Sequence, residues 1–458
     1  MILIDYFGNE KFRFLEILIF PRFINNCQFL ILLKKRMKLT NFFKPKNIAL
    51  IGASNHAEKV GGVLMKKILG FKGEIIPVNY NHSEIFGFKC YNSIGDYKGK
   101  IDLAIIAIPA EFVSNSIREC GEKGIKEIII LTAGFSEVGN ISEEKDILDV
   151  ARKYGIRILG PNCFGICNPR NNLDCTFSMT APEKGDIAFI SQSGALWSFI
   201  SDFSIGKFGF SGFVSLGNMT DLDFSDFIEH FSRDTKTKSI IIYVEKLKDG
   251  KNFIEVCKKC KKPIFAVKSG SSEEGEKAAF SHTGSLATDY EIYRGAFKQA
   301  GVELCSSLEE AFEKASGEKF VFNNKSKINL GKKIFIITNA GGAGALVSDY
   351  VSEKGIKLVS SSLKNPFDIL GTAKSEDYRI ALEKTKNIDG DSIIVIVTPQ
   401  SMTDLENIAR VVCDFKSVSK KNVVALFLGG KGVGGSLDIL KKAGVSEFGT
   451  LEEFRESL

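Results

Sequence analysis

The chain has 458 residues, 44% hydrophobic and 25% charged, which is ordinary for a globular protein and too long for a single hydrophobic core. Its net charge of +6 is small, and half of it lies in residues 1–36, so charge gives no argument for a nucleic-acid partner. The ten cysteines lack the spacing of a secreted disulfide framework, and the pair Cys257 and Cys260 has no second ligand pair, so we expect no metal site and reduced thiols in the cytoplasm.

Residues 1–36 are rich in Phe, Ile and Leu, but charged side chains interrupt them. No run approaches the ~20 apolar residues that a membrane span needs. A basic start and a small-residue cleavage site, which a signal peptide would have, are also missing. Met37 directly precedes the first well-patterned segment. We therefore expect 1–36 to be an extension outside the domains, with translation starting at Met37, and we expect no membrane association.

Beyond Met37, short apolar strands alternate with helical segments. Strands are predicted at 47–52, 75–78, 103–108, 127–131 and 157–159, with helices at 63–69, 111–122 and 143–154. Apolar strands followed by small residues recur at 186–194 and 333–342. Continuous apolar strands alternating with helices predict parallel sheets covered on both faces, and the fold class is therefore doubly wound α/β.

Two stretches interrupt this alternation. The segment 167–182 is poor in strands and holds two prolines, and residues 321–332 are polar and unpatterned. The predicted boundaries give three α/β domains, at 37–167, 168–325 and 326–458.

The loop that begins Gly52-Ala-Ser lies between the first strand and the first helix, where backbone N–H groups can approach a phosphate. It is not a strict GxGxxG sequence. A dinucleotide site also expects a carboxylate at the end of the second strand, where this chain has Val78-Asn79. This counts against NAD and leaves another nucleotide-bearing ligand open.

A second loop, Ser191-Gln-Ser-Gly, offers two hydroxyls and a glycine at a helix start. It could cradle a phosphate, or Ser191 or Ser193 could simply cap the helix. The other histidines, His56, His82 and His230, receive no catalytic role, and His230 is expected just after an amphipathic helix.

His282 lies in Ser281-His-Thr-Gly-Ser, between a strand ending near Lys268 and a helix at 290–300. Its small and hydroxylic neighbours favour a loop that meets a phosphoryl group, although a lone loop histidine is more often inert. A nucleophilic histidine needs one ring nitrogen held while the other attacks. Glu245, at the tip of the strand 240–245, could hold it, or could be a solvated strand end.

From Met37 onward, the chain resembles the alpha subunit of ADP-forming acetyl-CoA synthetase, a relative of the succinyl-CoA synthetase alpha subunit. The resemblance is carried in order by Ile51-Gly-Ala-Ser, Ile76-Pro-Val-Asn, Ala107-Ile-Pro-Ala, Ala133-Gly-Phe-Ser-Glu, Gly160-Pro-Asn-Cys-Phe-Gly, Ile190-Ser-Gln-Ser-Gly-Ala-Leu, Ser215-Leu-Gly-Asn, Ser281-His-Thr-Gly-Ser-Leu-Ala and Asn365-Pro-Phe-Asp. Each segment alone is weak, whereas the ordered set spans all three domains.

The resemblance implies a Rossmann-like CoA-binding domain followed by two flavodoxin-like domains. It implies that His282 becomes a phosphohistidine and that Glu245 orients it. CoA would be bound by Gly52, Ala53, Ser54, Asn79, Ile108, Pro109, Asn162 and Cys163. Phosphate or the acyl group would be held by Ser191, Gln192, Ser193, Gly194, Gly217, Asn218, Thr283 and Gly284.

The family reaction converts acyl-CoA, ADP and phosphate into a carboxylic acid, ATP and CoA through an acyl phosphate. The sequence contains no GxxxxGK[ST] loop and no nucleotide-grasping domain. The resemblance therefore implies an ATP-grasp beta subunit as an obligate partner, and ADP or ATP with Mg²⁺ is expected there. The alternative is a regulatory module that binds CoA or a nucleotide without chemistry, and such a module would not need His282.

Overall fold

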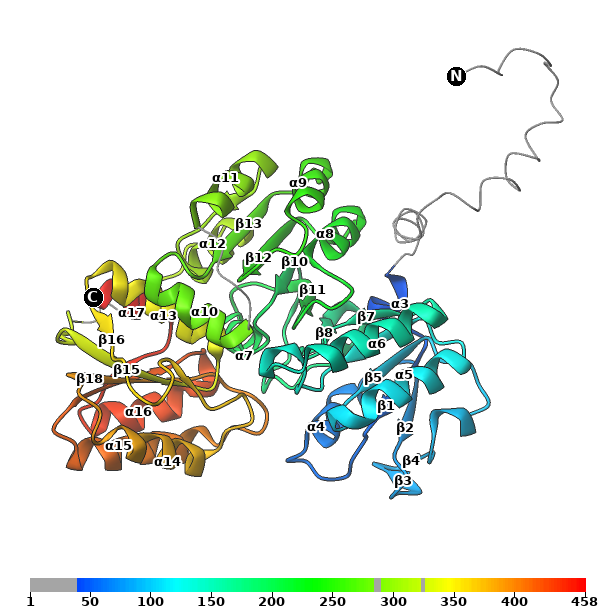
Figure 1. Ribbon diagram of the computed structural model, residues 1–458, viewed down its shortest axis with the longest axis horizontal. Helices are drawn as coiled ribbons and strands as arrows, with labels where there is room; N and C mark the ends of the chain where they lie inside the picture. The colour runs from blue at the N-terminus through cyan, green and yellow to red at the C-terminus, as the bar shows by residue number, and fades with distance from the viewer. Residues whose placement is uncertain (1–38, 284–289, 323–325) are drawn as a thin grey trace, which may run out of the picture. The chain divides into compact units, whose positions relative to one another are not determined.

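The computed structural model describes residues 39–283, 290–322 and 326–458, with the side chains of 279–283 left out (Figure 1). It divides into two units, Met1–Thr40 and Asn41–Leu458, and all three main sheets belong to the second. The expectations for residues 1–36 lie outside the described residues.

The first sheet is wholly parallel, with the strand order β2-β1-β5-β6-β7. Its strands are β1 (Asn47–Ile51), β2 (Glu74–Val78), β5 (Leu103–Ile106), β6 (Glu127–Ile130) and β7 (Arg157–Leu159). Its helices are α4 (Val60–Ile68), α5 (Val113–Glu122) and α6 (Ile141–Tyr154), and a small hairpin joins β3 (Glu84–Ile85) to β4 (Phe88–Lys89).

The second sheet has the order β14-β13-β12-β10-β11-β8-β9. Its parallel strands are β10 (Lys184–Ser191), β11 (Phe210–Ser215), β12 (Ser239–Val244), β13 (Ile264–Lys268) and β14 (Glu303–Leu304). The segment expected to be poor in strands adds two short antiparallel ones at the edge, β8 (Ile166–Asn168) and β9 (Leu173–Asp174). The helices are α7 (Ala195–Phe203), α8 (Phe224–Arg233), α9 (Gly250–Lys259), α10 (Glu273–Thr283), α11 (Tyr290–Ala300) and α12 (Leu308–Ser316).

The third sheet is parallel, with the order β16-β15-β18-β19-β20, and β17 (Phe367–Asp368) pairs separately with β15. Its strands are β15 (Lys333–Thr338), β16 (Lys357–Leu358), β18 (Ser392–Val397), β19 (Asn422–Phe427) and β20 (Ser446–Phe448). The helices α14 (Ser375–Thr385), α15 (Leu405–Val418) and α16 (Gly434–Lys442) cover one face, and α13 (Gly341–Glu353) and α17 (Leu451–Ser457) cover the other (Figure 1).

The parallel doubly wound fold expected from the sequence is confirmed. Numbered within each sheet, the main parallel strands run 2-1-3-4-5, which is the flavodoxin-like order. The first sheet therefore differs in detail from the Rossmann order 3-2-1-4-5-6, because within the described ranges no third strand lies outside the second. It keeps the feature that matters for binding, a reversal of strand order beside its first strand.

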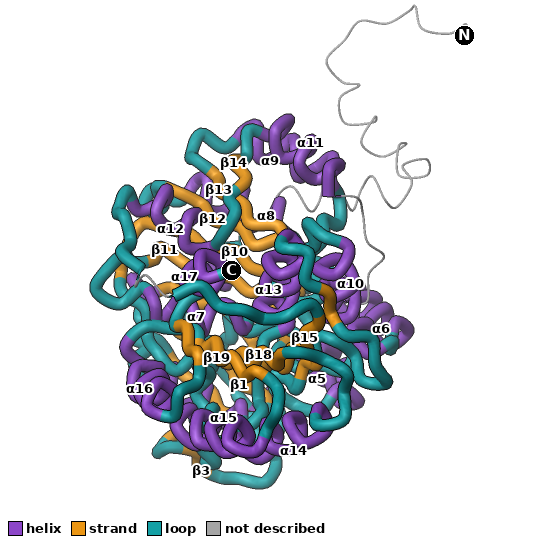
Figure 2. The backbone as a smooth tube through the Cα atoms, turned by 90° about the vertical axis from the view of Figure 1, so that its left-hand side faces the viewer, coloured by secondary structure: helices purple, strands orange, loops and turns teal. Residues whose placement is uncertain are grey.

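One continuous hydrophobic core joins the second and third sheets. It includes Phe189 and Trp197 from the second sheet and its helix α7, and Ile336, Leu346 and Phe454 from the third sheet and its helices α13 and α17. Figure 2 shows the C-terminus beside α13 and α17. This shared core fixes the N-terminus of α13 against the second sheet.

Two smaller expectations concern helices. Cys257 lies in α9, as expected, and Cys260 follows directly at its end; both are free thiols. His230 does not follow a helix but lies inside α8, stacked on Phe43 with ring centroids 4.4 Å apart. Within the described part of the chain, no helix is both long and apolar enough to cross a membrane.

Candidate functional site

Gly52 lies at the carboxyl end of β1, where the first sheet reverses its order between β1 and β5. Its φ of +93° belongs to a region that favours glycine, and a Cβ there would overlap the carbonyl oxygen of Ala107. Its N–H donates to the carbonyl of Val78 over 3.0 Å. The ends of β1, β2 and β5 therefore converge on this glycine, at the place where doubly wound sheets bind ligands.

The neighbouring predicted CoA-binding residues belong to the same cluster. Ala53 and Ser54 are buried, and Asn79 Nδ2 donates to the carbonyl of Ala53 over 2.8 Å. Gly61, in the first turn of α4, packs so closely that a Cβ would overlap the carbonyl oxygen of Gly52. The loop is thus pressed against a helix N-terminus, where backbone N–H groups suit a phosphate.

Thr132 links the remaining predicted CoA-binding residues to one another. Its hydroxyl donates to the carbonyl of Ile108 over 2.7 Å, next to Pro109, and its carbonyl accepts from the N–H of Asn162 over 2.9 Å. Cys163 is buried, and burial raises the pKa of its thiol to about 12, so it is a packing residue and no nucleophile.

The Gly217–Asn218 loop of the second sheet lies directly against this first-sheet loop. The N–H of Asn218 donates to the carbonyl of Pro161 over 2.9 Å, and a Cβ on Gly217 would overlap the same carbonyl oxygen. The side chains of Asn162 and Asn218 meet, with Nδ2 of Asn162 3.3 Å from Oδ1 of Asn218. A residue expected to bind CoA and one expected to bind phosphate or acyl are therefore neighbours.

Two carboxylates that sequence reasoning missed surround Asn218. Its Nδ2 donates to Glu137 Oε2 over 2.6 Å and to Glu144 Oε2 over 2.8 Å. The nearest signal was the Ala133-Gly-Phe-Ser-Glu segment, which ends at Glu137 but indicated no partner. Glu144 lies among other acidic residues in the first turn of α6, where such residues are common for helix-dipole reasons alone.

The Ser191–Gly194 loop does not cap its helix through a hydroxyl. Ser191 is fully buried and its Oγ donates to the carbonyl of Ser193 over 2.6 Å, while Gly194 is the N-cap of α7. The capping explanation for the two serines is therefore wrong. The N-terminus of α7 keeps backbone N–H groups without a side-chain acceptor from these residues, which suits an anion.

Gln192 connects this loop with Glu245. Its Oε1 accepts from the N–H of Glu245 over 2.6 Å and from that of Lys246 over 2.8 Å. Glu245 is only 7% exposed, so its interpretation as a solvated strand end is wrong. Among the described residues, Gln192 Nε2 is buried and finds no hydrogen-bond acceptor, and a buried orphan donor of this kind fits an anionic ligand.

A second helix N-terminus faces the same loop, which sequence reasoning missed. A Cβ on Gly342, in the first turn of α13, would lie 2.5 Å from Ser193 Oγ. The hydroxyl of Tyr243 donates to the carbonyl of Gly342 over 3.2 Å. The available signal was the Asn339-Ala-Gly-Gly run after a strand, which repeats the opening of the earlier units. The positive ends of α7 and α13 therefore meet at one place.

His282 was expected in a loop, but its backbone belongs to the last turn of α10. The side chains of His282 and Thr283 and the whole of Gly284 lie outside the described residues. Helix α10 packs along α13 and also reaches the short 3₁₀ helix η5 (Ser136–Val138) of the first sheet layer. Asp349 of α13 ties down the start of α10, accepting from Gly270 N over 2.7 Å and Ser272 Oγ over 2.8 Å.

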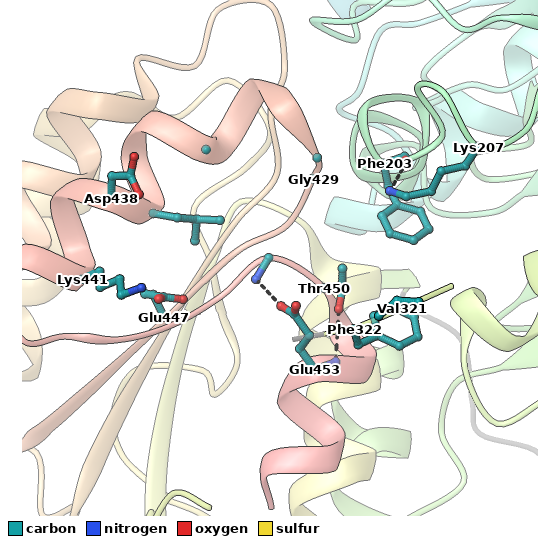
Figure 3. Close-up of a pocket in the computed structure, with 14 residues that line it drawn as sticks. Phe203, Lys207, Val321, Phe322, Gly429, Asp438, Lys441, Glu447, Thr450 and Glu453 are labelled. Atoms are coloured by element: carbon teal, nitrogen blue, oxygen red, sulfur yellow. Dashed lines mark hydrogen bonds between the residues drawn. The ribbon is translucent and has the colours of Figure 1, made fainter. Parts of the chain in front are cut away.

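A cavity of about 370 Å³ lies elsewhere, at the carboxyl ends of β19 and β20 (Figure 3). Lys207, Gly429, Thr450 and Glu453 are among its lining residues, and none of the predicted site residues is. The described side chains contain no group of three His, Cys, Asp or Glu that could hold a metal ion.

Two family models match parts of the chain. Residues 46–169 match the family described as a CoA binding domain, and residues 184–316 match the succinyl-CoA ligase like flavodoxin domain. The chain is 41% identical to acetate–CoA ligase (ADP-forming) II subunit alpha of Pyrococcus furiosus, over 90% of this chain and 94% of that one. It is also 41% identical to acetate–CoA ligase (ADP-forming) of Methanocaldococcus jannaschii, over 89% of this chain and 60% of that protein.

Among solved structures, the chain is similar to the dinucleotide forming acetyl-coenzyme A synthetase 1 of Ca. Korarchaeum cryptofilum in complex with phosphate and ADP. The TM-score is 0.59 and the identity 34%, over 92% of this chain and 95% of that chain. Fold and loops thus define a protein of the succinyl-CoA ligase type, with a CoA-binding domain. Within that class, the chain belongs to the family of ADP-forming acetate–CoA ligase alpha subunits.

Proposed function

We propose that this chain is the alpha subunit of an ADP-forming acyl-CoA synthetase, an acid–thiol ligase. The observation that carries the proposal is its 41% identity to such a subunit over 94% of that subunit's length. The geometry supports it, because the first-sheet loop around Gly52 and the two helix N-termini near Ser193 suit the two anionic reactants, CoA and phosphate. The domains are proposed at 37–167, 168–325 and 326–458, in a cytoplasmic protein.

In this proposal, phosphate is held between the N-termini of α7 and α13, with Gln192 Nε2 as a further donor. A phosphate oxygen attacks the thioester carbon of acyl-CoA, the carbon–sulfur bond breaks, and CoA leaves as the thiol with the proton that phosphate gives up. A ring nitrogen of His282 then attacks phosphorus, and the phosphorus–oxygen bond to the acyl group breaks, releasing the carboxylic acid. Glu245 holds the imidazole for this attack.

The phosphoryl group must finally pass from His282 to ADP. We infer that ADP or ATP and Mg²⁺ are bound by an ATP-grasp beta subunit and that the two chains form a hetero-oligomer. Support comes from the alpha-subunit names of two relatives and from the longer Methanocaldococcus jannaschii enzyme, of which this chain covers 60%.

Phosphopeptide mapping tests the proposal. The chain is incubated with acetyl-CoA and labelled inorganic phosphate, together with an ATP-grasp beta subunit, and acid-labile phosphate is mapped. We expect it on His282, discharged by ADP and absent in His282→Asn. A chain that binds CoA but stays unphosphorylated with a partner active on another alpha subunit would instead support the non-catalytic binding module.

A further inference from the structure

Glu144 reaches from the first sheet layer into the loop that follows β11 of the second. It lies in the first turn of α6, and its Oε2 accepts from the N–H of Ser136 over 3.0 Å and from Asn218 Nδ2 over 2.8 Å. Its Oε1 accepts a short hydrogen bond from the hydroxyl of Thr220. One carboxylate thus holds η5 and both ends of the Asn218–Thr220 turn.

Lys248, which follows β12 of the second sheet, also binds the Asn218–Thr220 turn. Lys248 Nζ donates to the carbonyls of Met219, over 3.0 Å, and Thr220, over 2.6 Å. Met219 sits at a φ of +58°, an unusual value for a residue with a side chain, so the turn needs these bonds to keep its shape. Glu144 is one of the acceptors that the first sheet layer supplies to this turn, beside Glu137 and the carbonyls of Pro161 and Gly160, and it binds both Asn218 and Thr220.

The charge on Glu144 is maintained in the folded protein. Burial alone would raise its pKa, but the hydrogen bonds from Ser136, Thr220 and Asn218 outweigh burial and hold the pKa below its ordinary value. Lys246, whose N–H is bonded to Gln192, is close enough to Glu144 to interact with it electrostatically. The carboxylate therefore faces the segment that carries Glu245 as well as the Asn218 turn.

We propose that Glu144 is a positioning residue that aligns the CoA-binding layer with the phosphate loops through Asn218. The proposal rests on the proposed function and deepens it. Asn218 is bonded to Asn162 on one side and to Glu137 and Glu144 on the other, and Glu144 also holds Thr220. Losing Glu144 therefore lets the Asn218–Thr220 turn shift against the Asn162 loop, although the backbone bonds to Pro161 and Gly160 remain. Of the predicted CoA-binding residues, Asn162 contacts Asn218, whereas Gly52, Ala53 and Ser54 have no described hydrogen bond to Asn218 or Glu144. We therefore expect CoA affinity to be retained when Glu144 is replaced.

Two substitutions separate the negative charge of Glu144 from its hydrogen bonds. Glu144→Gln keeps an oxygen for Ser136 N and Asn218 Nδ2, and its NH₂ group can donate to the Thr220 hydroxyl, which also accepts. Glu144→Ala removes every one of these bonds. Glu143→Ala is the matched control, because Glu143 is exposed in the same turn of α6.

The experiment uses the full chain with its beta subunit, acetyl-CoA and inorganic phosphate, and measures CoA affinity by calorimetry and the rate of phosphohistidine formation. We expect Glu144→Ala to lower the rate about 100-fold, as a displacement near 1 Å does, with CoA affinity unchanged. Glu144→Gln should lose about tenfold, because it exchanges charged hydrogen bonds for neutral ones, and Glu143→Ala should match wild type.

The outcomes distinguish this proposal from the function beneath it. If wild type forms no phosphohistidine, the proposed function fails. If wild type is active and Glu144→Ala equals it, Glu144 positions nothing and the proposal is overturned. Equal losses of CoA affinity and rate in Glu144→Ala, together with a lower melting temperature, would also overturn it, because Glu144 would then only support the fold.

Discussion

Nδ2 of Asn162 donates a hydrogen bond to Oδ1 of Asn218 over 3.3 Å, and the two residues lie in the loops that follow β7 of the first sheet and β11 of the second. Asn162 keeps a φ of +55° while its N–H is bonded to Thr132, so its loop is held from the first sheet. Asn218 is held by two carboxylates of the same layer. The pair thus joins the place where CoA is expected to the place where phosphate is expected.

Substitution of Asn218 tests that junction. Asn218→Asp would set a third carboxylate against Glu137 and Glu144, whereas Asn218→Ala only removes donors. We expect Asn218→Asp to be the more damaging, costing about 1–3 kcal/mol of unfolding free energy and lowering phosphohistidine formation further than Asn218→Ala. Urea unfolding and the phosphorylation assay provide the measurements. Equal effects of the two variants would mean that the carboxylates do not face Asn218.

Gly52→Ala should disrupt CoA binding. The added Cβ would overlap the carbonyl of Ala107, in addition to the strain of about 1–3 kcal/mol for a side chain at this φ. Gly124→Ala is the control, because Gly124 has a φ of +84° with open space around it. Calorimetry should find CoA binding lost in the first variant and kept in the second. Normal CoA affinity in Gly52→Ala would remove this loop from the site.

Gly342→Ala should separate the two helix N-termini. Its Cβ would lie 2.5 Å from Ser193 Oγ, so α13 or the serine loop must move. We expect inorganic phosphate to bind more weakly, so that half-maximal phosphohistidine formation needs a higher phosphate concentration. CoA affinity should be retained. Gly434→Ala places the same methyl group at the start of α16, in open space, and should behave as wild type.

Glu245→Gln should lower the yield of phosphohistidine while CoA binding stays near normal. The backbone bond from Glu245 N to Gln192 does not depend on the side chain, so the loop should keep its shape. Only the side-chain charge, which we propose orients the imidazole, is lost. Parallel losses of CoA affinity and phosphohistidine would assign Glu245 a purely structural role.

We expect the free energy of unfolding to depend on pH because of His230, whose pKa is lowered in the folded protein. Burial lowers its pKa to about 4, Asp234 opposes this, and Lys44, Arg233 and Lys262 add to it. Because the folded pKa lies below the unfolded value of about 6.5, protons bind the unfolded chain first, and stability falls as pH drops from about 6.5 to about 4.

The loss amounts to about 3 kcal/mol when the interval is crossed. His230→Phe keeps a ring against Phe43 but cannot titrate, so it should lack this part of the acid destabilisation. Urea unfolding of both proteins at pH 7 and pH 4.5 measures the difference. Identical pH dependence in the two would contradict the prediction.

The local pattern of apolar residues was sufficient to predict the strands, the helices and the parallel α/β fold class. Runs such as Ile128–Ile130 are apolar on both faces, and only a parallel sheet covered by helices buries both, so strands and helices could be placed from sequence. The loops after those strands could also be predicted as candidate binding loops, because parallel sheets of this kind bind ligands at the carboxyl ends of their strands. The helical backbone of His282 could not be predicted, because its small neighbours are typical of loops. The helix is favoured from its other end, where Glu273, Glu274 and Glu276 stabilise the start of α10.

The sequence by itself therefore determined the fold class and the loops around Gly52, Ser191 and Glu245. Only the tertiary structure decided which loops meet. The contact of Asn162 with Asn218, the reach of Glu144 to Asn218, and the approach of Gly342 to Ser193 join segments far apart in the chain. Such contacts follow from how the three layers pack against one another, and local periodicity reports only which face of a segment is apolar, not which neighbour covers it.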